Sequence, residues 1–404
     1  MTVYRGLPSS RPLEIEKVLD VVKGIVDYVK SFGDKALIEF TKRFDGVEID
    51  SVTLDRDQLN KCCRDLDTSI KNALNKVYDF LVKVHELCKP RDIIVEINGV
   101  KLGYVWRSIE SVGIYVPGGR KAYPSTLLMA GVPAKVAKVN KLYVTSPPTP
   151  NGCLNPAVAY LSILLEVEEV YRIGGAHAIA ALAYGTESVK KVQKIVGPGN
   201  IYVQAAKYLV QQVVAIDGIE GPTELVVIAD DNADPKTIAV DMMAQAEHGY
   251  GSMVALISVS EEVTLEVSKI LEQDTDHDYY VAVVDDVMKA IDIANSLAPE
   301  HLSLHIRDAH KYIPYIVNAG AVSISREPPA LIDYIGPNHI LPTNRWATSR
   351  GALSVFDFLK PVSVILDSSS IDSDLLKSVI LIAEYEGFSV HGRSVGLRFK
   401  RSTR

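Results

Sequence analysis

Two series of short apolar segments, each alternating with helix-like stretches, constrain the fold of this chain more than any other feature. Short apolar strands that alternate with helices are typical of βαβ units, which build a mostly parallel sheet. We therefore predict an α/β protein with two Rossmann-like but incomplete domains. The first series is Gly113–Gly119, Lys141–Ser146, Val167–Gly175 and Lys194–Asn200, and the second is Leu225–Ala229, Met253–Ser258, Tyr280–Val284, Leu302–Ile306 and Ala321–Ser325.

Helical spacing dominates the chain before these series. It runs from Leu13 to Phe44, with a second helix starting at Lys35, and again from Ile70 to Leu87. A β-hairpin is predicted around Asn98-Gly99, because this dipeptide favours a tight hairpin turn. The predicted domains are the N-terminal helical part of domain 1 (1–110), an inserted α/β domain (111–222), the α/β part of domain 1 (223–362) and a C-terminal tail (363–404).

The tail after Pro361 reads as a strand, a helix from Asp372 to Tyr385 and a final segment that contains His391. A piece this short cannot bury a core of its own. It must therefore dock elsewhere, on its own chain or on a partner subunit.

Composition excludes several classes of protein. The net charge of −7 and the scattered Lys and Arg residues argue against a nucleic-acid-binding surface. The four cysteines form no C-x-x-C pair, so neither a disulfide framework nor a thiolate metal site is predicted, and reduced thiols are expected. Without a targeting segment or a long apolar run, the protein is expected to be soluble and cytoplasmic.

The stretch from Asp234 to Gly249 predicts where the functional site lies. Asp234 suits a helix N-cap, Pro235 the first helical position and Gly249 a left-handed stop, so a helix of about four turns is expected. On this helix Gln245 shares the apolar stripe and His248 lies at its edge, so both should face inward. Buried polar groups need partners, and a metal ion would supply one. A hydrogen-bonded core glutamine with a histidine near a helix end is the plainer alternative.

A carboxylate and an imidazole also stand side by side at Glu300-His301, before a predicted strand. The two groups can supply proton transfer near neutral pH, although a structural role is an alternative. Because the pair precedes its strand, topology alone does not place it at the carboxyl edge of a sheet, where ligands usually bind.

Further candidate ligands lie in the Asp333–His339 loop and at His391. Loops of this composition are often simple turns. Asp333 and His391 nevertheless complete a possible set with Gln245 and His248, whose donors are only nitrogen and oxygen. Such a set suits catalysis or substrate binding better than a structural zinc site.

Three glycine turns follow predicted strands. Gly197–Asn200 precedes a helix, and Asp217 follows at the distance seen in a dinucleotide-binding fingerprint, but Tyr202 occupies the place of the third glycine. Tyr115–Gly119 and Ile173–His177 are the other two. None is a standard Rossmann loop, and a tight turn is the alternative for each.

In collinear order over nearly the whole chain, these motifs resemble histidinol dehydrogenase. The motifs that carry the resemblance are Gly33–Asp45, Tyr115–Gly119, Pro124–Thr126, Gly174–Leu182, Gly197–Asn200, Gly221–Asp230, Gln245–Gly249, Leu297–Leu302, Asp333–Thr343 and Glu386–Val395.

The resemblance implies oxidation of L-histidinol to L-histidine with two NAD⁺, at the end of histidine biosynthesis, through an aldehyde held by the enzyme. It implies a homodimer in which the partner subunit donates His391. One zinc ion would be held by Gln245, His248, Asp333 and His391, and NAD would contact Tyr115, His177 and Asn200. Substrate contacts would be Thr223, Gln245, His248, Glu300, Asp333, His339, Glu386 and His391.

The chemistry of the substrate agrees with these roles. Histidinol carries an imidazole and an amine, which are good zinc donors, so a metal ion can orient the alcohol carbon for hydride transfer. We hypothesise that His301 removes the hydroxyl proton in both oxidations and that Glu300 activates the water that hydrates the aldehyde. NAD supplies the redox chemistry.

The sequence departs from the family pattern at a few positions. His177 stands where the family usually has Gln, Thr223 replaces a common Ser, and the loop from Thr343 has Arg345 for a glycine and Thr348 for an Arg.

Two alternative functions remain: a paralogue that oxidises another polar alcohol, such as a sulfonated diol, and a non-catalytic metal- or nucleotide-binding protein.

Overall fold

The structure, a computed structural model, describes residues 2–8, 13–118, 123–249, 251–274, 276–324 and 327–399. The predicted glycine turn Tyr115–Gly119 ends on Gly119, and the predicted strand Ala321–Ser325 on Ser325, so both end residues lie outside this part. The chain divides into two compact units. Unit 1 comprises Met1–Cys88 and Glu110–Phe358, and unit 2 comprises Lys89–Ile109 and Leu359–Arg404.

Unit 1 contains two six-stranded sheets. The first sheet has the order β2-β7-β6-β5-β8-β9, and all its neighbours are parallel except β2 and β7. Short apolar segments of the first predicted series form its central strands. The strands are β2 (Thr53–Leu54), β5 (Ser111–Tyr115), β6 (Lys141–Thr145), β7 (Glu169–Tyr171), β8 (Lys194–Val196) and β9 (Ala215–Ile216).

The second sheet has the order β1-β12-β11-β10-β13-β14 and is parallel throughout. Its central strands are apolar on both sides because helices cover both faces. Leu225 and Val227 pack under α8 (Pro235–Ala246) and α9 (Glu261–Leu271), while Val226 and Ile228 pack under α10 (Val287–Leu297). The strands are β1 (Thr2–Arg5), β10 (Glu224–Ala229), β11 (Met253–Ser258), β12 (Asp278–Val283), β13 (His301–His305) and β14 (Ala321–Ile324).

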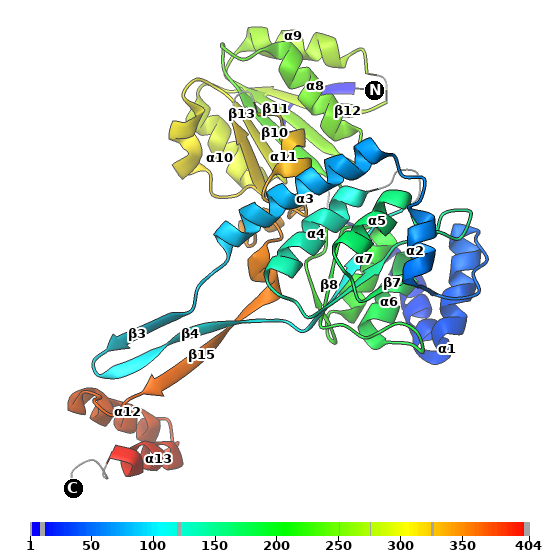
Figure 1. Ribbon diagram of the computed structural model, residues 1–404. Helices are drawn as coiled ribbons and strands as arrows, with labels where there is room; N and C mark the ends of the chain where they lie inside the picture. The colour runs from blue at the N-terminus through cyan, green and yellow to red at the C-terminus, as the bar shows by residue number, and fades with distance from the viewer. Residues whose placement is uncertain are drawn as a thin grey trace. The chain divides into compact units, whose positions relative to one another are not determined.

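Helices cover both faces of each sheet (Figure 1). α1, α6 and α7 pack together on one face of the first sheet, and α4 packs with α3 and α5. The longer helices are α1 (Leu19–Asp45), α3 (Thr68–Cys88), α4 (Pro124–Val136), α6 (Gly175–Tyr184), α7 (Ile201–Val210), α8 (Pro235–Ala246), α9 (Glu261–Leu271) and α10 (Val287–Leu297). The shorter ones are η1 (Ile15–Lys17), α2 (Arg56–Cys62), α5 (Pro156–Leu164), η2 (Ala309–Tyr315), α11 (Pro329–Ile335), η3 (Trp346–Thr348) and η4 (Val355–Phe358).

Both sheets are wound in the same way. In the first, the chain goes from β5 outward to β6 and β7, then returns to place β8 and β9 on the other side of β5. In the second, β10, β11 and β12 run one way, and β13 and β14 lie on the other side of β10. The prediction of two Rossmann-like α/β sheets is therefore confirmed, and the switch points lie between β5 and β8 and between β10 and β13. The exact domain boundaries remain a prediction.

Unit 2 consists of a three-stranded antiparallel sheet, order β15-β4-β3, and two helices. The predicted hairpin is confirmed, with positive φ at both Asn98 and Gly99. The end of the tail forms a helix that periodicity did not predict. The elements are β3 (Ile93–Ile97), β4 (Val100–Ser108), β15 (Leu359–Asp367), α12 (Ser373–Tyr385) and α13 (Ser389–Phe399).

The expectation that all four cysteines are reduced thiols is wrong. Cys62 and Cys153 form a disulfide with their Cα atoms 5.5 Å apart, while Cys63 and Cys88 remain free. The two bonded residues are 91 positions apart, so their spacing gave no signal of pairing. They meet because α2 packs against α5. Among the described helices, none is long and apolar enough to cross a membrane.

Candidate active site

A cavity of about 500 Å³ in unit 1 is lined by residues from both α/β halves. The first half contributes the end of β5 and the loop after β8. The second half contributes the residues before β10, the start of β13, α8 with the turn after it, α11 and the loop that follows α11. Among the lining residues are Tyr115, Gly118, Gly199, Asn200, Thr223, Gln245, His248, Glu300, His301, Asp333 and His339.

The two sheets present opposite edges to this cavity. Tyr115 ends β5, and Asn200 follows β8, so the first sheet offers the carboxyl edge of its switch point, where α/β proteins usually bind ligands. The second sheet offers its amino edge, with Thr223 before β10 and Glu300 before β13. Glu300 and His301 therefore line a cavity although they lie at the amino end of β13. They do so because the carboxyl edge of the first sheet lies on the other side of this cavity.

Glu300 is held by a reciprocal pair of hydrogen bonds with Glu224. The Glu224 N–H donates to Glu300 Oε2 at 3.0 Å, and the Glu300 N–H donates to Glu224 Oε2 at 3.3 Å. The Thr223 hydroxyl also donates to Glu300 Oε2. Within the described part of the chain, the other oxygen, Oε1, accepts no hydrogen bond. One oxygen is thus fixed, and the other is available to a ligand.

Burial sets the protonation of Glu300 and Glu224. The pKa of Glu300 is raised to about 8. Burial is the largest cause, the hydrogen bonds from Thr223 and Glu224 oppose the rise, and the neighbouring carboxylates of Glu224 and Asp333 add to it. Burial also raises the pKa of Glu224 to about 7. Glu300 can therefore both gain and lose a proton near neutral pH, as proton transfer in catalysis requires.

His301 is almost fully buried, and burial lowers its pKa to about 3. Its imidazole is therefore neutral at pH 7 and able to accept a proton. Its Nε2 atom lies 3.7 Å from Asp333 Oδ1, a carboxylate that would stabilise the resulting positive charge. Its Nδ1 atom has no hydrogen-bond partner among the described residues.

The α8 helix starts as predicted, with Asp234 accepting a hydrogen bond from the Lys236 N–H. Gln245 is buried in the cavity wall and donates to the Thr223 hydroxyl. The expectation that His248 also faces inward is wrong in part: α8 ends at Ala246, so His248 belongs to the following turn and is exposed, although it lines the same cavity.

α11 and the loop after it bring two more predicted residues to this cavity. The segment Asp333–His339 was predicted as a loop, but Asp333 lies on α11 and only the residues after Ile335 follow the helix. Asp333 and His339 both line the cavity, and the His339 ring nitrogen Nδ1 lies 2.7 Å from the Asp333 carbonyl oxygen. Glu386 and His391 belong to unit 2, where both are exposed. Their predicted contacts with substrate and metal remain predictions.

The donors in the cavity fit a zinc ion in kind. Gln245, His248 and Asp333 line one space and offer nitrogen and oxygen atoms. No group of three His, Cys, Asp or Glu residues that could hold a metal ion was found in the described ranges. The predicted set would not form such a group, because it takes only His248 and Asp333 of these types from unit 1.

The carboxyl edge of the first sheet has features that suit a dinucleotide. The Tyr115 hydroxyl accepts a hydrogen bond from the Gly175 N–H at 3.2 Å, which joins β5 to the start of α6. Asn200 caps α7, accepting from the N–H groups of Tyr202 and Val203. A helix N-terminus of this kind favours a phosphate. Gly197 has a φ of +120°, and a Cβ there would meet the Tyr115 carbonyl oxygen at 2.0 Å, so only glycine fits.

His177 differs from the other predicted cofactor contacts. It is 1% exposed and packs against Phe40 and Phe44, with ring centroids 5.7 and 6.1 Å away. Burial lowers its pKa to about 3, and neither ring nitrogen has a hydrogen-bond partner in the described part of the chain. It is not among the residues that line the cavity, so its contact with NAD remains a prediction.

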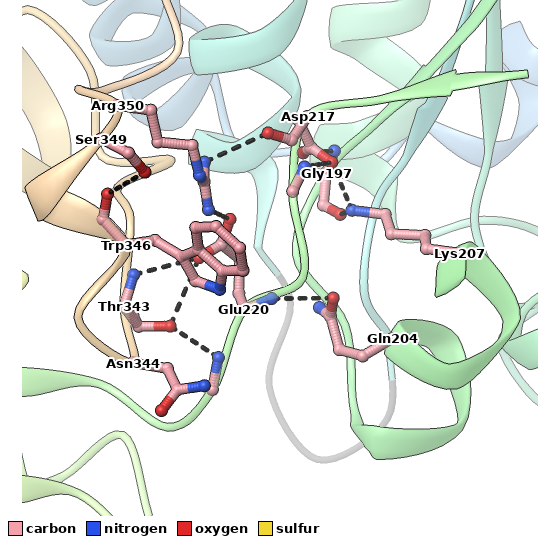
Figure 2. Close-up of polar contacts among 12 residues, drawn as sticks. Gly197, Gln204, Lys207, Asp217, Glu220, Thr343, Asn344, Trp346, Ser349 and Arg350 are labelled. Atoms are coloured by element: carbon pink, nitrogen blue, oxygen red, sulfur yellow. Dashed lines mark hydrogen bonds and ion pairs between the residues drawn. The ribbon is translucent and has the colours of Figure 1, made fainter. Parts of the chain in front are cut away.

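A polar network joins the Gly197–Asn200 loop to residues 217–223, which connect the two halves (Figure 2). We call residues 217–223 the linking segment. The Asp217 carboxylate accepts from the Gly197 N–H at 2.7 Å and from Lys207 Nζ at 2.6 Å. Asp217 is thus engaged within the protein, and the fingerprint-like spacing reflects a structural ion pair.

Sequence reasoning missed the other members of this network, because they come from distant segments. Gln204 on α7 donates to the Gly199 carbonyl at 3.1 Å and accepts from the Glu220 N–H at 3.0 Å. The Glu220 carboxylate accepts from the Thr343 N–H at 3.0 Å and pairs with Arg350. Burial raises the pKa of Glu220, and Arg350 opposes this rise.

Two of the departures from the family pattern have a visible setting. Asn344 and Arg345 adopt positive φ angles of 51° and 62°, a conformation in which glycine is usual. Thr348 donates from its hydroxyl to the Arg345 carbonyl at 2.9 Å. The arginine of this loop that forms an ion pair is Arg350, whose partner is Glu220.

Comparison with known proteins gives one consistent result. The family model described as histidinol dehydrogenase matches residues 9–399. The chain is 52% identical to histidinol dehydrogenase of Saccharolobus solfataricus, over 98% of this chain and 99% of the relative. It is 51% identical to that of Sulfurisphaera tokodaii, over 98% of this chain and 100% of the relative. The crystal structure of histidinol dehydrogenase from Elizabethkingia anophelis has a TM-score of 0.92 at 32% identity and covers 100% of this chain and 99% of that chain.

Proposed function

The chain belongs to the histidinol dehydrogenase family and is an NAD-dependent oxidoreductase, and on this premise we propose that it oxidises L-histidinol to L-histidine through L-histidinal. Each oxidation consumes one NAD⁺. The observation that supports this proposal best is a single cavity that holds candidate metal ligands, a carboxyl–imidazole pair and the carboxyl edge of an α/β sheet.

Zinc would be held by Gln245, His248 and Asp333 of one subunit and by His391 of the partner subunit. The nitrogen and oxygen donors that line the cavity suit this ion. When bound, zinc supplies a Lewis acid that orients the imidazole and amine of histidinol.

The remaining polar side chains of the cavity would hold the substrate. Thr223 bridges Glu300 and Gln245 through its hydroxyl, so the proposed substrate and metal residues share one hydrogen-bonded group. His339 contacts the Asp333 carbonyl oxygen through Nδ1, and its other ring nitrogen would recognise the substrate. We assign substrate contacts to these five residues and to His248, Glu386 and His391.

Proton transfer falls to His301 and Glu300. Neutral His301 removes the hydroxyl proton of histidinol as the hydride leaves, and Asp333 stabilises the imidazolium. Glu300, with its free Oε1, then takes a proton from the water that adds to the aldehyde. His301 accepts the proton of the hydrated aldehyde in the second oxidation. The products of the two steps are L-histidine, two NADH and the released protons.

NAD is assigned to the carboxyl edge of the first sheet, in contact with Tyr115, His177 and Asn200. It supplies the hydride acceptor. The α7 N-terminus supports this assignment, because Asn200 at its start lines the cavity and the positive end of a helix favours a phosphate.

Unit 2 supports a homodimer. Only Gly392 is buried in its two helices, while Tyr385 is 93% exposed and Leu381 is 66% exposed. Apolar surface of this kind is typical of protein–protein contacts. The proposed partner is a second copy of the chain. Tyr385 and Leu381 lie on α12, and His391 lies on the following helix, α13. We place the enzyme in the cytoplasm, where amino-acid biosynthesis supplies its substrate.

The test is the stoichiometry of NADH formed per histidinol consumed. Zinc-loaded enzyme should form two NADH per histidinol, and a chelator should abolish the reaction until zinc is restored. Formation of one NADH would reject the two-step reaction. Turnover of another polar alcohol, such as a sulfonated diol, but not of histidinol would favour the paralogue.

A further inference from the structure

The linking segment passes between the proposed cofactor site and the proposed substrate site. It begins at Asp217, which holds the Gly197 N–H, and ends at Thr223, which holds Glu300 and Gln245. Any change in the course of this segment would move one site relative to the other. Hydride transfer depends on that spacing, because reacting atoms must approach to about 3–3.5 Å.

Two buried side chains fix the middle of the segment. We propose that Gln204 and Glu220 are positioning residues that hold the Gly197–Asn200 loop at a fixed spacing from Thr223. This proposal rests on the proposed function, since it concerns the NAD site of that reaction.

Gln204 connects the cofactor loop to the segment directly. Its side-chain amide uses both ends: Nε2 donates to the Gly199 carbonyl, and Oε1 accepts from the Glu220 N–H. It is 1% exposed, so neither bond can be replaced by bulk water. Shifting the segment would break one of these bonds or carry Gly199 with it.

Glu220 fixes the segment to the second half from the other side. Its carboxylate accepts from the Thr343 N–H and hydroxyl, at 3.0 and 3.3 Å, and pairs with Arg350. Arg350 in turn donates to the Asp217 carbonyl at 3.1 Å, and the Gly221 N–H donates to the Thr343 hydroxyl at 2.5 Å. The segment is therefore held at Asp217, Glu220 and Gly221 by one loop of the second half (Figure 2).

The strength of NAD binding distinguishes a positioning role of Gln204 and Glu220 from a role in folding alone. Gln204→Met removes both amide bonds at similar volume, and Glu220→Gln keeps the shape but offers one acceptor oxygen in place of two. Each variant should raise the Kd for NAD at least fivefold in titration calorimetry. KM for NAD should rise equally, and KM for histidinol should change less than twofold.

The double variant tests whether the two residues act together. If they position one loop through one path, Gln204→Met with Glu220→Gln should weaken NAD binding no more than the worse single variant. If the increases in the Kd for NAD from the two single variants multiply in the double variant, the two residues do not position the loop through one path.

Tyr279→Phe is the matched control for stability. Tyr279 is fully buried on β12 and donates to Asp274. Its loss should lower Tm and leave the Kd for NAD unchanged. If the Gln204 and Glu220 variants behave like this control, the two residues only stabilise the fold and the inference is wrong.

The wild-type protein separates this inference from the proposed function. Wild type that binds NAD but does not oxidise histidinol would contradict the proposed function, while the calorimetry would still decide the inference. Wild type that does not bind NAD would overturn both.

Discussion

Breaking the Cys62–Cys153 disulfide should destabilise unit 1 substantially. The bond closes a loop of 91 residues between α2 and the chain before α5. In the chain-entropy model, a loop of this length restricts the unfolded state by about 4.6 kcal/mol at 25 °C. Removal of native disulfides usually costs about 2–5 kcal/mol. We therefore expect Cys153→Ser to lose about 2–5 kcal/mol of unfolding free energy.

Urea unfolding with and without a reductant is the measurement. Reduced wild type should match Cys153→Ser, and the variant itself should not respond to the reductant. Reduced wild type is the more informative sample because it keeps both side chains. The m value should also rise on reduction, since a chain without the cross-link exposes more surface when unfolded.

The two free cysteines provide the controls. Cys88 is exposed, and Cys63 is buried beside Cys62. Cys88→Ser should leave stability within about 0.5 kcal/mol of wild type, and Cys63→Ser should retain the response to reductant. The reasoning fails if peptide mapping of the unreduced protein finds no Cys62–Cys153 link, or if reduction changes stability by less than about 0.5 kcal/mol.

Three further outcomes follow from the site and its surroundings. Glu300→Gln should slow oxidation of histidinal about 10²–10⁴-fold while slowing the first hydride transfer much less, as single-turnover rates with histidinol and histidinal would show; equal losses would argue against water activation. Glu224→Gln leaves either the Glu300 or the Asn344 N–H without an acceptor, so it should cost about 1–3 kcal/mol of unfolding free energy in urea. Half-buried Asp45 has its pKa raised from 3.8 to about 6 by burial, so the folded state binds this proton more tightly and loses stability as pH rises between these values. Asp45→Asn should therefore be more stable than wild type by about 1 kcal/mol above pH 6, after allowance for solvent screening, and should show no such gain at pH 4 in thermal unfolding.

The sequence alone was enough for the repetitive elements. Alternating apolar strands and helices predicted two α/β sheets because each parallel strand must be covered on both faces. Local capping chemistry also placed helix ends: Asp234 caps α8, and Asn98-Gly99 forms the hairpin turn. These signals depend only on residues that are close in the sequence, so they can be recognised without knowledge of the fold.

Features that depend on distant contacts could not be read in this way. The disulfide joins positions 91 residues apart, and Gln204 and Glu220 meet only where the two halves are linked. His248 was expected to face inward because the helix was extended past Ala246, where the chain actually turns.

The order of the motifs identified the residues that gather in the cavity, through the resemblance to a family. Gln245, Glu300 and Asp333 are among them. Tertiary structure decided how they gather: the amino edge of one sheet faces the carboxyl edge of the other. It also decided their protonation, since burial raises the pKa of Glu300 to about 8 and lowers that of His301 to about 3. Burial is a property of the packed chain, so a sequence can place these groups in order but cannot set their charge.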